Sequence, residues 1–419
     1  MELSIPSKLT SLKKALGFSA LESVGSRVFD FVTLWIVLNT LTSNDLALFG
    51  LATSALFFFN AIFVAPETAL LRFQKNWAAN DELSEYISSF LFFSGIKIFV
   101  HYIGAVTIYL YFGNMNWLVY AVIFSTITQQ IQLAEIARIN MRMDLRQEFV
   151  AKFELVSKIV LCSICLVLFK KPSLVLYFFL YLTWSALSAL FWILNLSKTI
   201  NVSFFGVKKS LKNVYESMLG FSLWSHVSGI LTFYIYNSNL LFLNFFNATV
   251  NSIALYTSVT KVANLFFVIP MFFQSFVPVV LSNSEHSTTQ QFRKLLFANG
   301  FLSLVQLVFF IVFGFLMAPF FGVKDQQQIH DFYYLGLIVN IGIFLLNISR
   351  PLSTFLLIRS HPKRVMFLIF IPSALFATVF YSFGAHQAGV YGCAIGSALT
   401  YAFMAVMLIA FYFSHKKHN

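Results

Sequence analysis

The sequence predicts an all-α membrane protein with about twelve transmembrane helices, arranged as two six-helix lobes around a central cavity, with both termini in the cytoplasm. Composition is the first observation: 58% of the residues are hydrophobic and only 11% are charged, against about 25% charged in a soluble domain. Second, apolar runs long enough to span a bilayer follow one another along almost the whole chain. Third, Lys and Arg concentrate in alternate connections, as they do in cytoplasmic loops.

Each apolar run is assigned a helix, because in lipid every backbone polar group must find its partner within the chain. The first run is too long for the apolar region of a signal peptide, so we expect it to be retained as a helix. Several runs exceed the length of a perpendicular crossing, which predicts tilted helices. The predicted spans are residues 16–41, 46–72, 86–112, 116–137, 151–169, 173–195, 214–244, 252–281, 295–319, 331–358, 365–384 and 388–413.

The orientation follows from the basic residues. With a cytoplasmic N-terminus, 20 of the 28 Lys and Arg residues lie in cytoplasmic connections or at the cytoplasmic ends of spans. Only Lys170, Lys171 and Lys324 lie in outside connections, which agrees with the positive-inside rule. The net charge of +12 therefore reflects topology and an anionic inner leaflet, and it does not indicate nucleic-acid binding.

The longest basic connection, residues 196–213, falls between the sixth and seventh predicted spans. It divides the chain into an N-terminal lobe, residues 1–195, and a C-terminal lobe, residues 214–419. Paired bundles of this kind are common in transporters, where they enclose a site near the middle of the membrane.

Three basic residues lie deep inside predicted spans. Arg27 is near the centre of the first span, with Asp30 three residues further on and on the same helix face. Lys97 is central in the third span, and Lys261 lies about 14 Å into the eighth. A charge at this depth is costly and usually faces a wet cavity or a partner, so we expect these residues to line a cavity. Structural pairing is the alternative.

Lys158 and Arg350 lie closer to the predicted cytoplasmic ends of their spans. Their long side chains can reach the interface by snorkelling, so a structural role and a cavity role are both open. Taken together the deep set is mainly cationic. A positive cavity suits an anionic head group such as a phosphate, pyrophosphate or acidic sugar, which Lys and Arg bind through charge-assisted hydrogen bonds.

Prolines inside predicted spans are candidate bending points, because each removes a backbone hydrogen bond. Pro270 and Pro278 lie in the eighth span, Pro351 in the tenth and Pro372 in the eleventh. Passive proline kinks are the alternative, since proline is common in membrane helices.

Other chemistry is not indicated. The chain contains no phosphate-binding or dinucleotide-binding glycine loop, its His residues are scattered without ligand spacing, and Cys162 and Cys165 lie in one apolar run with no second pair. We therefore expect no metal site, no cofactor and no catalytic residues. Outside connections are short, and a membrane-embedded enzyme would usually carry a large one. An enzyme is not predicted.

Several stretches resemble the polysaccharide transporters of the multidrug/oligosaccharidyl-lipid/polysaccharide flippase superfamily, which include the O-antigen and capsule repeat-unit flippases. Residues 44–60 and 65–73 resemble the family's second helix, with its aromatic-glycine pair and a terminal Arg. Residues 132–160 resemble its basic connection between the fourth and fifth helices. Residues 253–280 match its Tyr-x-x-Ala-x-Lys pattern, with Val in place of Ala, and residues 389–401 resemble its last helix.

This resemblance implies a flippase that moves an undecaprenyl-pyrophosphate-linked oligosaccharide across the bacterial inner membrane by alternating access. It implies a two-lobed cavity with cationic lining, in agreement with Arg27, Lys97 and Lys261. The expected partners are the lipid-linked oligosaccharide, the bilayer and other polysaccharide-assembly proteins. Two alternatives stay open: a drug/cation antiporter of the same superfamily, which would need deep carboxylates, and a membrane-embedded polysaccharide polymerase.

Overall fold

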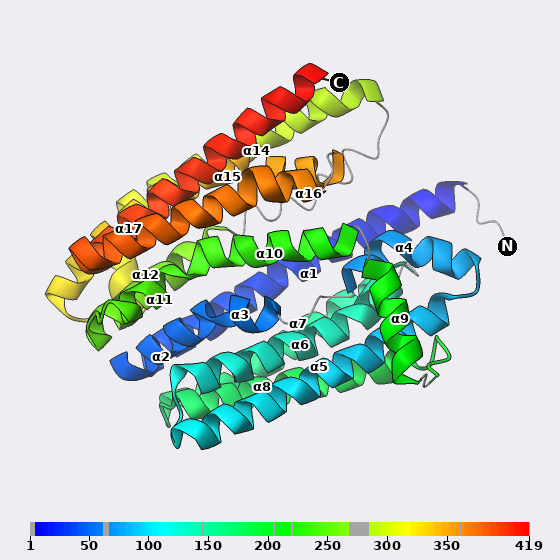
Figure 1. The fold of residues 1–419 in the computed structure, drawn as a ribbon, viewed down its shortest axis with the longest axis horizontal. Coiled ribbons are helices and arrows are strands. Elements are labelled where there is room, and N and C mark those ends of the chain that lie inside the picture. Colours follow the sequence, from blue (N-terminus) through cyan, green and yellow to red (C-terminus); the bar gives the residue numbers. More distant parts are fainter. Residues whose placement is uncertain are drawn as a thin grey trace. The chain divides into compact units, whose positions relative to one another are not determined.

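The computed structural model describes residues 5–61, 67–143, 146–203, 206–218, 221–267, 285–359 and 362–418. Within these ranges the chain is almost entirely helical and contains no strand (Figure 1). The helices are α1 Ile5–Thr40, α2 Ser43–Ser54, α3 Leu56–Ala61, α4 Glu67–Ala79, α5 Leu83–Phe112, α6 Trp117–Met143, α7 Gln147–Cys165, α8 Leu174–Leu196, α9 Val207–Met218, α10 Phe221–Asn237, α11 Asn239–Phe245, α12 Val250–Leu265, α14 Glu285–Phe320, α15 Gln326–Arg359, α16 Pro362–Val365 and α17 Ile371–His418.

The predicted all-α membrane fold is confirmed. Five helices of the described ranges are long and apolar enough to cross a membrane, namely α5, α8, most of α14, most of α15 and the stretch Lys363–Ser414. The last of these holds two of the predicted spans, because its backbone leaves the helical conformation at Ala388 and Gly389, where Gly389 has a φ of 53°. The total of twelve spans and the cytoplasmic position of the termini stay predictions.

Capping residues mark the ends of several helices near the predicted boundaries. Gly113 adopts a left-handed conformation, with φ of 66°, and closes α5 through its N–H bond to the Tyr109 carbonyl. Thr42, Ser173 and Thr249 precede α2, α8 and α12, and each side chain accepts a hydrogen bond from a backbone N–H of the first turn. Such caps satisfy donors that a helix leaves open at its start.

Two predicted spans are wrong as single helices. The span 46–72 is interrupted by a turn at Ala55 between α2 and α3, and its residues 62–66 lie outside the described ranges. The span 214–244 is divided among α9, α10 and α11. A hydropathy average missed the turn at Ala55 because apolar residues continue through it. Between α10 and α11 the polar residues 237–239 are too few to interrupt the average over a long apolar window.

Helix α9 orders the basic connection between the predicted lobes. Its buried side is largely polar and packs on α5. Asn213 donates hydrogen bonds to Glu85 Oε1 at 3.0 Å and to Ser89 Oγ at 2.9 Å, and Lys209 pairs with Glu85 at 3.0 Å. The second part of this connection, from residue 207 on, is therefore helical and is held in place by side-chain contacts.

The proline predictions have different outcomes. Pro351 lies within α15, which continues past it to Arg359. Pro372 follows a short π-helix, Met366–Phe370, in which the backbone hydrogen bonds join residues five apart. Because proline has no N–H, Pro372 donates no hydrogen bond to this turn. Pro270 and Pro278 lie outside the described residues.

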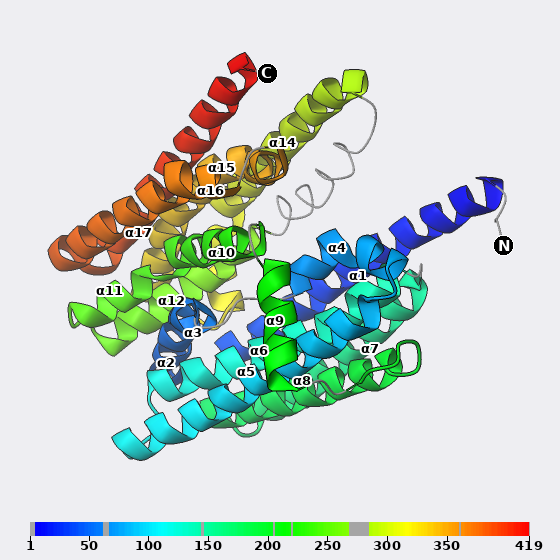
Figure 2. The same ribbon diagram turned by 45° about the vertical axis from the view of Figure 1, so that its right-hand side comes forward.

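The chain divides into two compact units. One comprises residues 1–37 and 58–223, and the other residues 38–57 and 224–419. Helices α5, α6 and α8 lie side by side in the first unit, and α14, α15 and α17 in the second (Figures 1 and 2). The predicted functional lobes, residues 1–195 and 214–419, stay a prediction.

Candidate functional site

Three of the predicted binding residues meet in the first unit. Lys158 on α7 donates to Asp30 Oδ1 on α1 at 2.6 Å, and Arg27 Nη1 lies 3.9 Å from Asp30 Oδ2. The side chains of Arg27, Asp30 and Lys158 are 45%, 39% and 14% exposed. This cluster, which we call the Arg27 cluster, contains two positive groups and one negative group, and its arginine is the most accessible member.

Close packing of α1 on α7 explains this meeting. A Cβ atom at Gly25 would overlap a terminal methyl of the Leu155 side chain, so a larger residue would require that leucine to shift. Further along, the Thr33 hydroxyl lies 3.1 Å from Cys162 Sγ, and Cys162 donates to the Phe29 carbonyl at 3.2 Å. Contacts on both sides of Asp30 thus align it with Lys158. Cys162 is a buried free thiol with a packing role.

Trp184 of α8 is a further neighbour of the cluster. Lys158 Nζ lies 5.2 Å from the centroid of a Trp184 ring, within the range of a cation–π interaction. The indole Nε1 donates to the Ser157 carbonyl at 2.8 Å, which fixes the ring. Trp184 is not among the site residues predicted from the sequence.

Lys97 lies elsewhere in the first unit, on α5, and is completely buried with 0% exposure. Its ammonium lies 5.7 Å from the Phe93 ring centroid. Its backbone carbonyl accepts a hydrogen bond from His101 Nδ1 at 2.7 Å. The depth of Lys97 in the membrane stays a prediction. A substrate contact for Lys97 stays a prediction.

Lys261 occupies the interior of the second unit. Its ammonium donates to Thr53 Oγ1 on α2 at 2.6 Å and lies 5.4 Å from the Phe49 ring centroid. A Cβ atom at Gly50 would overlap the Thr257 side chain, so glycine allows α2 to approach α12 here. The aromatic-glycine pair of one sequence motif, Phe49 and Gly50, therefore lies next to Lys261 of another. Among the described residues Lys261 forms no ion pair.

Tyr256, five residues before Lys261, contacts other helices from the opposite side of α12. It is fully buried, and its hydroxyl accepts from Asn239 at 3.1 Å and lies 3.3 Å from Ser397 Oγ. The Tyr of the predicted pattern is thus a packing residue, whereas the Lys at its end contacts the polar Thr53.

Arg350 of α15 lies against aromatic rings in the same unit. Its guanidinium carbon is 4.6 Å from the Phe267 centroid and 5.4 Å from the Tyr236 centroid. Phe267 and Tyr236 are themselves stacked at 5.3 Å. Cation–π contacts of this kind are strongest away from water, which gives the arginine a structural support that sequence reasoning did not foresee.

An ion-pair network in the first unit was also missed. Arg138 contacts Glu135 at 2.7 Å and Glu154 at 2.8 Å, and Arg142 contacts Glu22 and Glu135, both at 2.6 Å. The network joins α1, α6 and α7 and satisfies carboxylates that lie within predicted spans. Its signal in the sequence is the spacing of residues 135, 138 and 142, which places an acid and two arginines on one helix face.

The described ranges contain no group of three His, Cys, Asp or Glu residues that could hold a metal ion.

No protein-family model matches the sequence, and no curated protein is detectably similar to it. Among solved structures, the lipid II flippase MurJ in an inward closed conformation is 15% identical with a TM-score of 0.69, and the match covers 96% of this chain and 87% of that one. An inward-facing multidrug resistance MATE family transporter of the MOP superfamily is 14% identical with a TM-score of 0.67, covering 93% and 94%.

A third structure, a MOP superfamily transporter from Pyrococcus furiosus, is 13% identical with a TM-score of 0.58, covering 97% of this chain and 91% of that one. It is described as having a binding pocket of reverse polarity that suggests a different function. The chain therefore has the fold of multi-span membrane proteins of the MATE and MurJ type.

Proposed function

We propose that this chain is a flippase that moves an undecaprenyl-pyrophosphate-linked oligosaccharide, an O-antigen or capsule repeat unit, across a bacterial inner membrane by alternating access. The supporting observation is Lys261, a partly buried ammonium held by a hydroxyl and an aromatic ring, with no carboxylate paired to it among the described residues. A cation without a fixed counter-ion is suited to a mobile anionic group. The shared fold with a lipid II flippase supports the same class of activity.

The Arg27 cluster supports an anionic substrate as well. Asp30 accepts from Lys158 and lies near Arg27, so the negative charge is shared between two cations. Arg27 keeps nearly half of its side chain accessible. A pyrophosphate offers several oxygen acceptors, and an arginine binds such oxygens in a bidentate manner.

The second candidate is a drug/cation antiporter, which the similarity to MATE family transporters favours. Such a protein requires a deep carboxylate that can release a proton or ion and accept a cation. Asp30 is the deep acid of the predicted set, and its pairing with Lys158 argues against that use. A polymerase has less support, because the matched solved structures named above are transporters and a flippase. The same observation supports the prediction that the chain is not an enzyme.

A surface-polysaccharide profile of the source organism tests the proposal. We expect deletion of the gene to remove long surface chains and to cause lipid-linked repeat units to accumulate on the cytoplasmic side, and restoration to reverse both. The sugars of the accumulated lipid identify the substrate. An unchanged profile together with increased sensitivity to cationic dyes would replace the flippase with the antiporter.

A further inference from the structure

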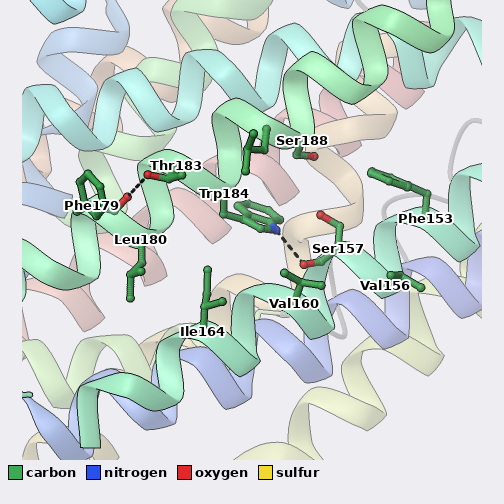
Figure 3. Close-up of a pocket in the computed structure, with 11 residues that line it drawn as sticks. Phe153, Val156, Ser157, Val160, Ile164, Phe179, Leu180, Thr183, Trp184 and Ser188 are labelled. Carbon is green, nitrogen blue, oxygen red and sulfur yellow. Dashed lines mark hydrogen bonds between the residues drawn. The ribbon is translucent and has the colours of Figure 1, made fainter. Parts of the chain in front are cut away.

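An apolar groove lies between α7 and α8 on the first unit (Figure 3). The groove has a volume of about 450 Å³. Its walls are one face of each helix, with Val156 and Val160 on α7, and Leu180 and Leu187 on α8. Lining residues extend from 153 to 164 on α7, so the groove follows the helix for about 16 Å at 1.5 Å per residue.

The polar groups that line this groove at Thr183 and Trp184 are directed at backbone carbonyls. The Thr183 hydroxyl donates to the Phe179 carbonyl at 2.8 Å, and the Trp184 indole donates to the Ser157 carbonyl at 2.8 Å. Figure 3 shows both bonds along the groove wall. Beside these two residues, only Ser157 and Ser188 contribute polar side chains to the lining, and the other lining residues are apolar. The groove therefore suits an apolar chain better than a sugar or a peptide.

Trp184 connects the groove to the Arg27 cluster. Its ring lines the groove, and the ammonium of Lys158 lies 5.2 Å from its centroid. Lys158 in turn binds Asp30, next to Arg27. The apolar groove and the ammonium of Lys158 thus lie against the same aromatic ring, and Arg27 follows on the far side of Asp30. A molecule with an apolar tail and an anionic head requires such an arrangement.

We propose that the groove between α7 and α8 binds the apolar chain of the lipid whose anionic head group is held at Arg27 and Lys158. The inference rests on the proposed function, because it takes the translocated lipid as the occupant. The tail stays in an apolar environment along the groove while the head group contacts the cations, so the chain avoids exposure to water during the crossing.

Photocrosslinking in proteoliposomes tests the proposal. The first probe is a polyprenyl pyrophosphate with a diazirine in its chain, and the second is a phosphatidylcholine with a diazirine in an acyl chain. We expect the prenyl probe to label peptides of α7 and α8 at the groove, and excess unlabelled polyprenyl pyrophosphate to remove that labelling. Phosphatidylcholine should label the groove weakly and without competition by the pyrophosphate lipid.

A matched pair of variants on α8 localises the effect. Leu187→Trp fills the groove, whereas Leu190→Trp makes the same change at a position that does not line it; the two leucines are 63% and 52% exposed. We expect Leu187→Trp to lower prenyl labelling by about tenfold, the effect of displacing about two buried methylenes, and Leu190→Trp to leave it unchanged. Lys158→Met should weaken labelling by the pyrophosphate probe and not by an uncharged prenol with the same diazirine.

The outcomes separate this inference from the proposed function. Equal, uncompeted labelling by both lipids would show bulk lipid in the groove and overturn the inference. Translocation of the pyrophosphate lipid without labelling of the groove would also overturn it while leaving the flippase standing. Competed labelling of the groove without translocation would support the groove and contradict the flippase.

Discussion

Replacing Lys261 with Met tests the role of the deep cation in the second unit. Lys261 donates to Thr53 Oγ1 at 2.6 Å, and a hydrogen bond from a charged group contributes about 1.5–3 kcal/mol. Thr53 also donates to the Gly50 carbonyl at 2.9 Å, so its hydroxyl keeps a partner when the ammonium is removed. In the Lys261→Met variant the loss of this hydrogen bond is offset, because the free-energy cost of removing an ammonium from water also disappears. We therefore expect the unfolding free energy to change by about 1 kcal/mol or less.

The effect on substrate should be much larger. If the ammonium binds a pyrophosphate oxygen, its removal costs about 1.5–3 kcal/mol of binding, which corresponds to roughly a 10- to 100-fold loss of affinity. The assay is translocation in proteoliposomes of a polyprenyl-pyrophosphate disaccharide with a fluorophore on the sugar. A membrane-impermeant quencher reports the fraction in the outer leaflet, and initial rates are compared below saturation.

Two further variants serve as controls for this prediction. Lys261→Arg keeps the positive charge and should retain a measurable rate. Thr53→Val keeps the ammonium but removes the hydroxyl that positions it, so we expect a smaller decrease of about 3- to 10-fold. A Lys261→Met protein that is folded, judged by its melting temperature in detergent, and that translocates at the wild-type rate would refute the reasoning.

Three other predictions concern packing and pairing. Gly50→Ala should lower stability in detergent by about 1–3 kcal/mol, because the new methyl overlaps Thr257; an unchanged melting temperature would contradict the close approach of α2 and α12. In a double-mutant cycle, Asp30→Asn and Lys158→Met should show a coupling of about 1 kcal/mol, since the pair is partly exposed, and additive effects would show that the contact contributes nothing. Asn213→Ala removes two hydrogen bonds to α5 and should speed amide hydrogen exchange in α9, whereas exchange at the wild-type rate would mean that other contacts hold this helix.

Much of the fold follows from the sequence because lipid restricts the backbone to helices. Continuous apolar runs located the long helices, and cap residues such as Thr42, Ser173 and Thr249 lie close to the predicted boundaries. The turn at Ala55 was missed because no change in hydropathy marks it. For α9 the signal was present: Ser210, Asn213 and Ser217 recur at helical spacing and are buried. A hydropathy average merges them with the apolar run that follows.

The candidate site was predictable only in part, for a physical reason. Helical spacing alone predicts that Arg27 and Asp30 lie on one face of α1, and the two side chains are 3.9 Å apart in the structure. Lys158 meets Asp30 across 128 positions of sequence, and Lys261 meets Thr53 across 208. Such contacts depend on which helices pack together, and hydropathy carries no information on that choice. The sequence could thus indicate a partner on the same helix, as for Arg27 and Asp30, whereas partners on other helices could not be predicted.

The most direct test of the account compares two substrates in proteoliposomes that contain the purified protein. One is the fluorescent polyprenyl-pyrophosphate disaccharide, and the other is a cationic dye, each measured with and without an imposed proton or sodium gradient. The account predicts that the pyrophosphate lipid moves between leaflets, that Lys261→Met slows this movement, and that the dye is not transported. Gradient-driven transport of the dye, with the pyrophosphate lipid remaining in its leaflet, would contradict the account.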